Sequence, residues 1–163
     1  MGLTTVRLLA QQFRLTANQT GSNSTGTVLT AWEEVDTSYD KIGNVWSQSS
    51  GTFSCANTGV YLCSWALVCN GNSAGDRYDP SIQISTDSGS SYNTRSLAWG
   101  MSENTSPIDL TTGNQFMFDV TNTTTFRLQF VEGTSNSVSS NTTISGNSNY
   151  TTTNILFVRL GDT

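Results

Sequence analysis

Apolar and polar positions alternate along the segment between residues 60 and 69. Large apolar side chains occupy every second position and the positions between them are mixed; the first set is Tyr61, Cys63, Trp65, Leu67 and Cys69. Successive side chains of a strand point to opposite faces, so a period of two indicates a strand with one buried face. We therefore expect this segment to be a strand whose large side chains lie in the core.

Shorter segments repeat this pattern farther along the chain. They are residues 81–85 (SIQIS), 115–120 (QFMFDV), 125–131 (TFRLQFV) and 154–160 (NILFVRL). Between them lie turn-forming sequences rich in Gly, Asn, Ser and Thr, and no segment carries a helical stripe of useful length. The pattern predicts an all-β fold, a sandwich or jelly roll of about eight to ten strands.

Length and charge narrow the possible partners. The chain has 163 residues, which suits a single domain with one core. Charged residues make up 12 % of the sequence, the net charge is −5, and Ser, Thr, Asn and Gly supply about half of the residues. One lysine and scattered arginines form no basic surface, which argues against nucleic acid or a membrane as partner. We expect residues 1–26 to be an N-terminal arm, a first strand or both, and residues 27–163 to be the jelly-roll domain.

The N-terminal sequence and the cysteines indicate the compartment. The first residues have too short an apolar patch for a signal peptide, and Val6 stands where a myristoylation signal has Ser or Thr. Cys63 and Cys69 share a strand face but lie about 20 Å apart, too far for a disulfide. An odd number of cysteines agrees with reduced thiols. We therefore expect Cys55, Cys63 and Cys69 to be core residues of a protein made in a cytoplasm.

Candidate catalytic chemistry is sparse. The sequence contains no histidine, which removes the commonest general base and every Ser-His or Cys-His arrangement. Glu33 and Glu34 project to opposite faces of a strand, and Glu34 shares a face with Asp36; we interpret them as a solvated acidic edge rather than an acid/base pair. Residues 85–92 (STDSGSSY) resemble an Asp-box hairpin, a structural turn in which Asp87 and Gly89 supply turn chemistry. The sequence predicts a protein that is not an enzyme and needs no cofactor.

One loop offers oxygen ligands that would suit calcium. The segment NGNSAGDRYDP supplies four of them, Asn70, Asn72, Asp76 and Asp79. The loop lacks the dense acidic ladder of an EF-hand, and Asn, Gly and Asp are also the residues of an ordinary turn between strands. We favour the turn and keep calcium as the weaker alternative.

The order of these motifs resembles the C1q/TNF-like jelly-roll family over residues 7 to 160. A Gly-x-Phe strand, a short turn and a Gly-Val-Tyr entry into a long aromatic strand fall at Gly51, Phe53, Gly59, Val60, Tyr61 and Trp65. A second family-like strand entry lies at Leu110, Gly113, Asn114 and Phe116, and TTTNILFVRL is similar to the closing strand. The resemblance implies an antiparallel jelly-roll sandwich that forms a three-fold trimer, with core or trimer packing residues at Phe53, Gly59, Tyr61, Trp65, Phe116, Phe118 and Leu128.

Within that family the chain looks most like bacteriophage virion members. These are head fibres and capsid decoration proteins, and the absence of a fibrous shaft favours a separate trimer on a capsid over a tail-fibre tip. The resemblance thus implies a non-enzymatic cement protein on the virion surface, made in the host cytoplasm, whose partners are itself and a major capsid protein or another virion protein.

Two alternatives stay open at this point. The first is a receptor-binding tip that recognises a host-surface glycan or protein through exposed aromatic side chains such as Trp46, Tyr78, Tyr92 or Trp99. The second is a secreted C1q-like ligand-binding module, which would require an export signal that the sequence does not show.

Overall fold

The structure is a computed structural model that describes residues 8–20, 26–36, 41–71, 77–101, 108–133 and 142–163. These residues form antiparallel strands and turns, and none of them lies in a helix. It follows that no helix of the described segments could span a bilayer.

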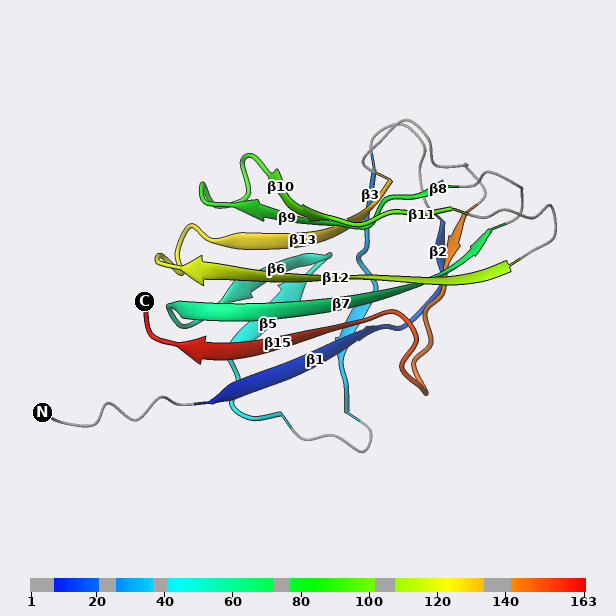
Figure 1. The fold of residues 1–163 in the computed structure, drawn as a ribbon. Helices are drawn as coiled ribbons and strands as arrows, with labels where there is room; N and C mark the ends of the chain where they lie inside the picture. Colours follow the sequence, from blue (N-terminus) through cyan, green and yellow to red (C-terminus); the bar gives the residue numbers. More distant parts are fainter. Residues whose placement is uncertain (1–7, 21–25, 37–40, 72–76, 102–107, 134–141) are drawn as a thin grey trace, which may run out of the picture.

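The first sheet is built around two long strands. β7 (Gly59–Gly71) and β12 (Ile108–Val120) pair along their whole length, and β12 forms one edge of the sheet. Beyond β7 the sheet continues through β15 (Asn154–Gly161), β1 (Leu9–Leu15) and β4 (Trp32–Glu34), while β14 (Thr143–Ile144) and β2 (Gln19–Thr20) extend it past the start of β15. Figure 1 shows β12, β7, β15 and β1 side by side.

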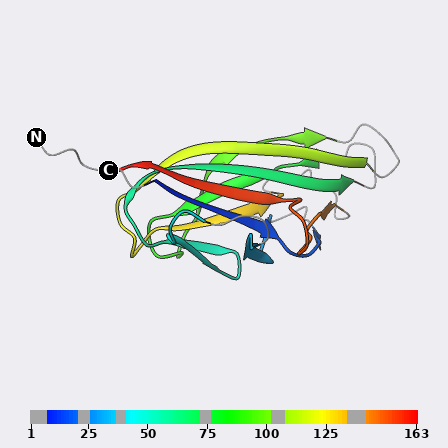
Figure 2. The ribbon, with the colours of Figure 1, turned by 90° about the horizontal axis from the view of Figure 1, so that it is seen from below.

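The second sheet has shorter strands and covers one face of the first. Its order is β10 (Asn93–Leu97), β9 (Ser81–Ser85), β13 (Arg127–Glu132), β6 (Thr52–Cys55) and β5 (Trp46–Ser49), and β3 (Thr27–Val28) also pairs with β13. A separate pairing joins β8 (Arg77–Tyr78) to β11 (Gly100–Met101). Figure 2 shows the two layers.

The all-β jelly-roll prediction is confirmed, with more strands than expected. The described residues form fifteen strands, but five of them, β2, β3, β8, β11 and β14, are two-residue pairings. A strand of two residues cannot be recognised from sequence, because the alternation of apolar and polar positions must repeat several times before it can be seen. The remaining ten strands match the upper end of the predicted number.

Aromatic side chains fill the space between the sheets. Trp46 of β5 stacks on Phe157 of β15 with ring centroids 4.2 Å apart, and Phe53 of β6 meets Phe13 of β1 edge-on at 5.1 Å. Such offset and edge-on pairs add to the free energy gained from apolar burial. The three cysteines are free and buried in this core, as expected.

Gly59 opens β7 with a backbone conformation that side chains rarely adopt. Its φ is +142°, and a Cβ atom there would lie 2.6 Å from Arg159 Nε and 2.6 Å from the carbonyl oxygen of Gly161. The Arg159 guanidinium donates hydrogen bonds from Nε and Nη2 to the carbonyl oxygen of Thr58. The glycine is therefore required both for the turn into β7 and for the close approach of β15.

Candidate interaction surface

The face of the first sheet that points away from the second sheet carries an apolar row. Strand register aligns one residue from each of four neighbouring strands, and Ile42 joins at the margin through a bridge to Ala10. The row runs, in order, through Ile42, Ala10, Val158, Leu62 and Met117. We call these five residues the apolar row; they cross the sheet from one margin to the other with no polar side chain among them.

The apolar row is exposed in the single chain. Ile42 is 50 % exposed and Met117 59 %, at its two ends, and the three residues between them are half-buried. Leu8, just before β1, and Leu160 of β15 flank the row and are 55 % and 45 % exposed. Water forms no hydrogen bonds with apolar side chains, so covering them by another surface lowers the free energy. A contiguous exposed apolar patch is therefore typical of an interaction site.

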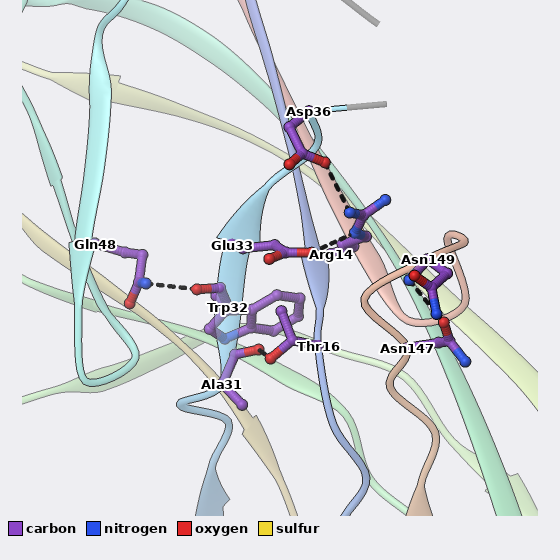
Figure 3. A network of polar contacts seen from close by, with 9 residues as sticks. All are labelled: Arg14, Thr16, Ala31, Trp32, Glu33, Asp36, Gln48, Asn147 and Asn149. Atoms are coloured by element: carbon purple, nitrogen blue, oxygen red, sulfur yellow. Dashed lines mark hydrogen bonds and ion pairs between the residues drawn. The ribbon is translucent and has the colours of Figure 1, made fainter. Parts of the chain in front are cut away.

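The same face becomes polar towards the other end of the strands. Two residues along from the row, Gln12 pairs with Leu156, and the Gln12 side chain donates a hydrogen bond to Asn154 Oδ1 at 3.4 Å. Beyond it, Arg14 is only 3 % exposed: its Nε donates to Glu33 Oε1 at 2.6 Å and its Nη2 to Asp36 Oδ1 at 2.8 Å. Figure 3 shows Arg14 between these two carboxylates.

The Arg14 network adds to the sequence-based view of the acidic residues. Glu33 and Asp36 share the Arg14 guanidinium, and Glu34 accepts an ion pair from Lys41 Nζ at 2.7 Å. The three carboxylates are partly solvated, as expected, since Asp36 is 74 % exposed and Glu33 and Glu34 are 35 % and 30 % exposed. The cations that pair with them come from other segments, and Arg14 links β4 and the segment after it to β1. These ion pairs are structural.

The end of the sandwich near the chain termini holds an open cavity of about 520 Å³. It is lined by residues from four segments, Leu9, Ala56, Asn57, Thr58, Thr123, Arg159 and Asp162. Its one cation is already used, because the Arg159 guanidinium is paired with the Asp162 carboxylate as well as with Thr58. The lining contains neither a nucleophile with an adjacent base nor a pair of carboxylates.

Two of the four calcium candidates lie among the described residues. Asn70 lies on β7, and Asp79 follows β8 and is fully buried. Asn72 and Asp76 lie outside the described residues. Among the described residues, no three His, Cys, Asp or Glu side chains come together as a metal site. Asp79 instead lies next to Glu132 at the end of β13. Glu132 is buried as well, and the sequence did not indicate this because Glu132 only follows an apolar run.

The packing candidates lie mainly between the sheets. Phe53, Tyr61, Trp65, Phe118 and Leu128 are buried in the core, Phe116 packs against it, and Gly59 forms the turn described above. The residues of the apolar row were not singled out by the sequence. Leu62 and Met117 occupy the alternate positions of β7 and β12, and only strand register places them in one line with Val158, Ala10 and Ile42.

The aromatic residues proposed for receptor contact divide into two groups. Trp46 and Tyr78 are 3 % and 0 % exposed, so the expectation that they lie on an exposed loop was wrong. Both follow turn-rich segments, but each side chain turns into the core. Tyr92 is half-buried, and Trp99, between β10 and β11, is 65 % exposed.

The Asp-box-like hairpin joins β9 to β10 as a structural turn. Asp87 Oδ1 accepts hydrogen bonds from Ser85 Oγ at 2.6 Å and from the Ser91 backbone N–H at 3.0 Å, and Oδ2 accepts from Ser91 Oγ at 2.6 Å. These donors, Ser85 first, lower the pKa of Asp87 to about 2. The predicted turn chemistry of Asp87 is confirmed.

Comparison with known proteins identifies the fold. No protein-family model matches the sequence, and no curated protein is similar to it. Among solved structures, the crystal structure of murine APRIL at pH 8.0 is similar with a TM-score of 0.65 and 11 % identity, covering 94 % of this chain and 99 % of that chain. The structure of Eiger TNF from S. frugiperda is similar with a TM-score of 0.59 and 14 % identity, covering 96 % and 95 %. The likeness shows that this chain has a TNF-like jelly-roll fold.

Proposed function

We propose that this chain is a non-enzymatic structural module that forms a homotrimer through the apolar row and decorates a virion capsid. The observation that carries the proposal is the apolar row itself, five aligned side chains that the described residues leave half-buried or exposed. Within the described part of the chain, no constellation of side chains offers catalytic chemistry, and the proposed function needs no cofactor.

The placement of the most exposed residues is compatible with a ring of subunits. Ile42 and Met117 stand at opposite margins of the face, on the β1 side and on the β12 side. In a cyclic assembly one margin of each copy packs against the other margin of the next, so both residues become buried in every interface. The three-fold order of the ring is what the resemblance to C1q/TNF-like jelly rolls implies.

Decoration of a capsid is supported by the resemblance to bacteriophage virion members. Such a protein acts by binding the assembled shell better than the free subunits, so that opening the shell must also break the added contacts. The proposal places the chain on the virion surface after synthesis in the host cytoplasm. Its partners are two further copies of itself and a capsid protein.

A receptor-binding tip is the second candidate, and one observation favours it. Trp99 is 65 % exposed and Leu97, two residues before it, is 39 % exposed, so an aromatic and an aliphatic side chain are both accessible where β10 leads to β11. An exposed tryptophan can stack on a sugar ring. The glycan or protein on a host surface would then be the partner in place of a capsid.

Co-sedimentation with capsids tests the capsid proposal directly. The purified chain is mixed with shells that lack it, and the bound fraction is measured after pelleting, for the wild type and for Trp99→Ala. We expect both to bind at a stoichiometry that is a multiple of three. Binding to host cells that Trp99→Ala abolishes, together with no binding to shells, would instead establish the receptor-binding candidate.

A further inference from the structure

A second unusual feature lies at the end of the sandwich away from the chain termini, where β3 and β8 are found (Figure 1). Glu132, the last residue of β13, pairs with Thr27 of β3, and its side chain is 0 % exposed. Asp79, just after β8, is 0 % exposed as well. Carboxyl groups are seldom fully buried, because transfer of the ionised form out of water is costly.

The hydrogen bonds of Glu132 are too few for a buried carboxylate. Its Oε1 accepts one bond, from the Asp79 backbone N–H at a long 3.3 Å. Its Oε2 has no hydrogen-bond partner among the described residues, and none of the ion pairs formed by the described side chains, which are those of Arg14, Lys41 and Arg159, involves it. Buried carboxylates that stay ionised accept two or three donors or face a cation. The geometry therefore favours the neutral, protonated acid.

The titratable groups that face Glu132 also favour its protonated form. They are the carboxyl group of Asp79, after β8, and the thiol of Cys69, on β7. Burial raises the pKa of Glu132 to about 8, and the negative charge of Asp79 adds to that increase. Burial, and then the charge of Glu132, raises the pKa of Cys69, so this thiol supplies no compensating charge.

The elements around Glu132 have few hydrogen bonds to hold them. β3 contributes two residues to the second sheet, and β8 is joined to β11 through two residues. Short pairings of this kind belong to the part of a protein that opens locally at low free-energy cost. A change of charge at Glu132 therefore acts on β3 and β8, which can open locally.

We propose that Glu132 is a proton-controlled latch: while protonated it keeps β3, β8 and β13 packed together, and loss of its proton to solvent lets this end of the sandwich open. The latch is independent of self-association and of any capsid, so it stands or falls separately from the proposed function.

The direction of the pH dependence follows from the two states of the latch. In the open state Glu132 meets water and titrates near its ordinary pKa of about 4.3, whereas in the closed state its pKa is about 8. Between these values the closed state holds a proton that the open state lacks. The opening equilibrium constant therefore rises about tenfold per pH unit over that window and levels off above it, where both states have lost the proton.

Hydrogen–deuterium exchange between pH 5 and pH 9 tests the latch. Exchange of backbone amides in residues 26–29, 77–81 and 128–133 is divided by the intrinsic rate at each pH, which leaves the opening constant. In the wild type we expect this constant to rise with pH up to about 8 and then to level. In Glu132→Gln, a neutral side chain of the same shape, it should be independent of pH. Asp119→Asn, an exposed carboxyl group at the far end of β12, is the matched control and should behave as the wild type does.

Three results would overturn the proposal. One is a flat profile in the wild type, which needs no variant and so decides the matter even if Glu132→Gln fails to fold. Another is the wild-type rise persisting in Glu132→Gln, since the titrating group would then be a different one. The third is closure at pH 8 by 1 mM CaCl2 in the wild type but not in Glu132→Gln, which would make the pair of acids a cation site instead.

Discussion

The outward faces of the two sheets differ although their inward faces are alike. Across the second sheet, the aligned outward side chains are Thr94, Gln83, Gln129, Thr52 and Ser49, all polar and uncharged. Gln129 Nε2 donates to Thr52 Oγ1 at 3.1 Å, and Gln83 Nε2 to Thr94 Oγ1 at 3.5 Å. Across the first sheet, the corresponding line is the apolar row.

This difference indicates which outward face is covered by another subunit and which stays in solvent. Polar side chains that bond to one another and to water suit a face that stays in solvent, whereas the apolar row gains free energy only when another surface covers it. The contrast lies in the side chains at the outward positions of the strands. It can be removed or reversed by substitution.

The largest effect is expected from a charge in the centre of the apolar row. Val158→Asp would bury an unpaired carboxylate in each subunit contact, and self-association should weaken by about 100-fold or more. Gln83→Asp, on the polar line of the second sheet, should leave it unchanged. Sedimentation velocity over a range of concentrations measures both; equal weakening by the two substitutions would remove the distinction between the faces.

Making the outward face of the second sheet apolar should increase self-association, by a smaller amount than Val158→Asp decreases it. Gln83→Leu combined with Gln129→Leu replaces two adjacent polar side chains by apolar ones. We expect new concentration-dependent species larger than the wild-type assembly, because both faces would then favour burial. Light scattering detects them, and Thr94→Ser is a neutral control. An unchanged size distribution would mean that apolarity alone does not decide which face is used.

Removal of the buried cation at the polar end of the same face should lower stability by a moderate amount. Arg14→Met keeps the apolar stem of the side chain, removes the guanidinium and frees Glu33 and Asp36, which are 35 % and 74 % exposed and can regain water. We expect the free energy of unfolding to fall by about 1–2 kcal/mol, less than for a pair whose carboxylates are also buried. Urea denaturation measures this change, and a larger loss would show that the carboxylates remain buried without their partner.

The smallest effect is expected at the β9–β10 hairpin of the second sheet. The pKa of Asp87 is lowered to about 2 by Ser85 and Ser91, so its ionised form stabilises the folded state. That contribution is complete above the ordinary pKa of 3.8 and is lost as the pH falls through about 2. The melting temperature should therefore fall less between pH 4 and pH 2 in Asp87→Asn than in the wild type. An identical decline in both would show that the hairpin carboxylate contributes nothing.

The fold could be predicted from sequence because its longest strands show a clear alternation of apolar and polar positions. The alternation from Tyr61 to Cys69 lies on β7, which pairs with three other strands and so organises the first sheet. The order of motifs that resembles C1q/TNF-like jelly rolls agrees with the fold seen in the comparison with solved structures. What the sequence could not supply is the partner of each strand, since alternation fixes faces and not neighbours.

The candidate surface and the polar contacts depend on that missing information. Leu62 and Met117 are 55 positions apart in sequence, and only the β7–β12 register brings them together. Glu132 and the Asp79 backbone are likewise joined across 53 positions. Trp46 and Tyr78 show the opposite failure: local sequence placed them in loops, but tertiary packing turned them into the core.

The mass of the wild-type chain in solution tests the central claim most directly. Mass photometry or sedimentation equilibrium at micromolar concentration distinguishes a single chain of 17.6 kDa from a trimer of about 53 kDa, three times that value. The proposal predicts the trimer, reduced to single chains by Val158→Asp and left intact by Gln83→Asp. A wild-type chain that remains at 17.6 kDa at every accessible concentration would contradict the account, because the apolar row would then be stable in water without a partner.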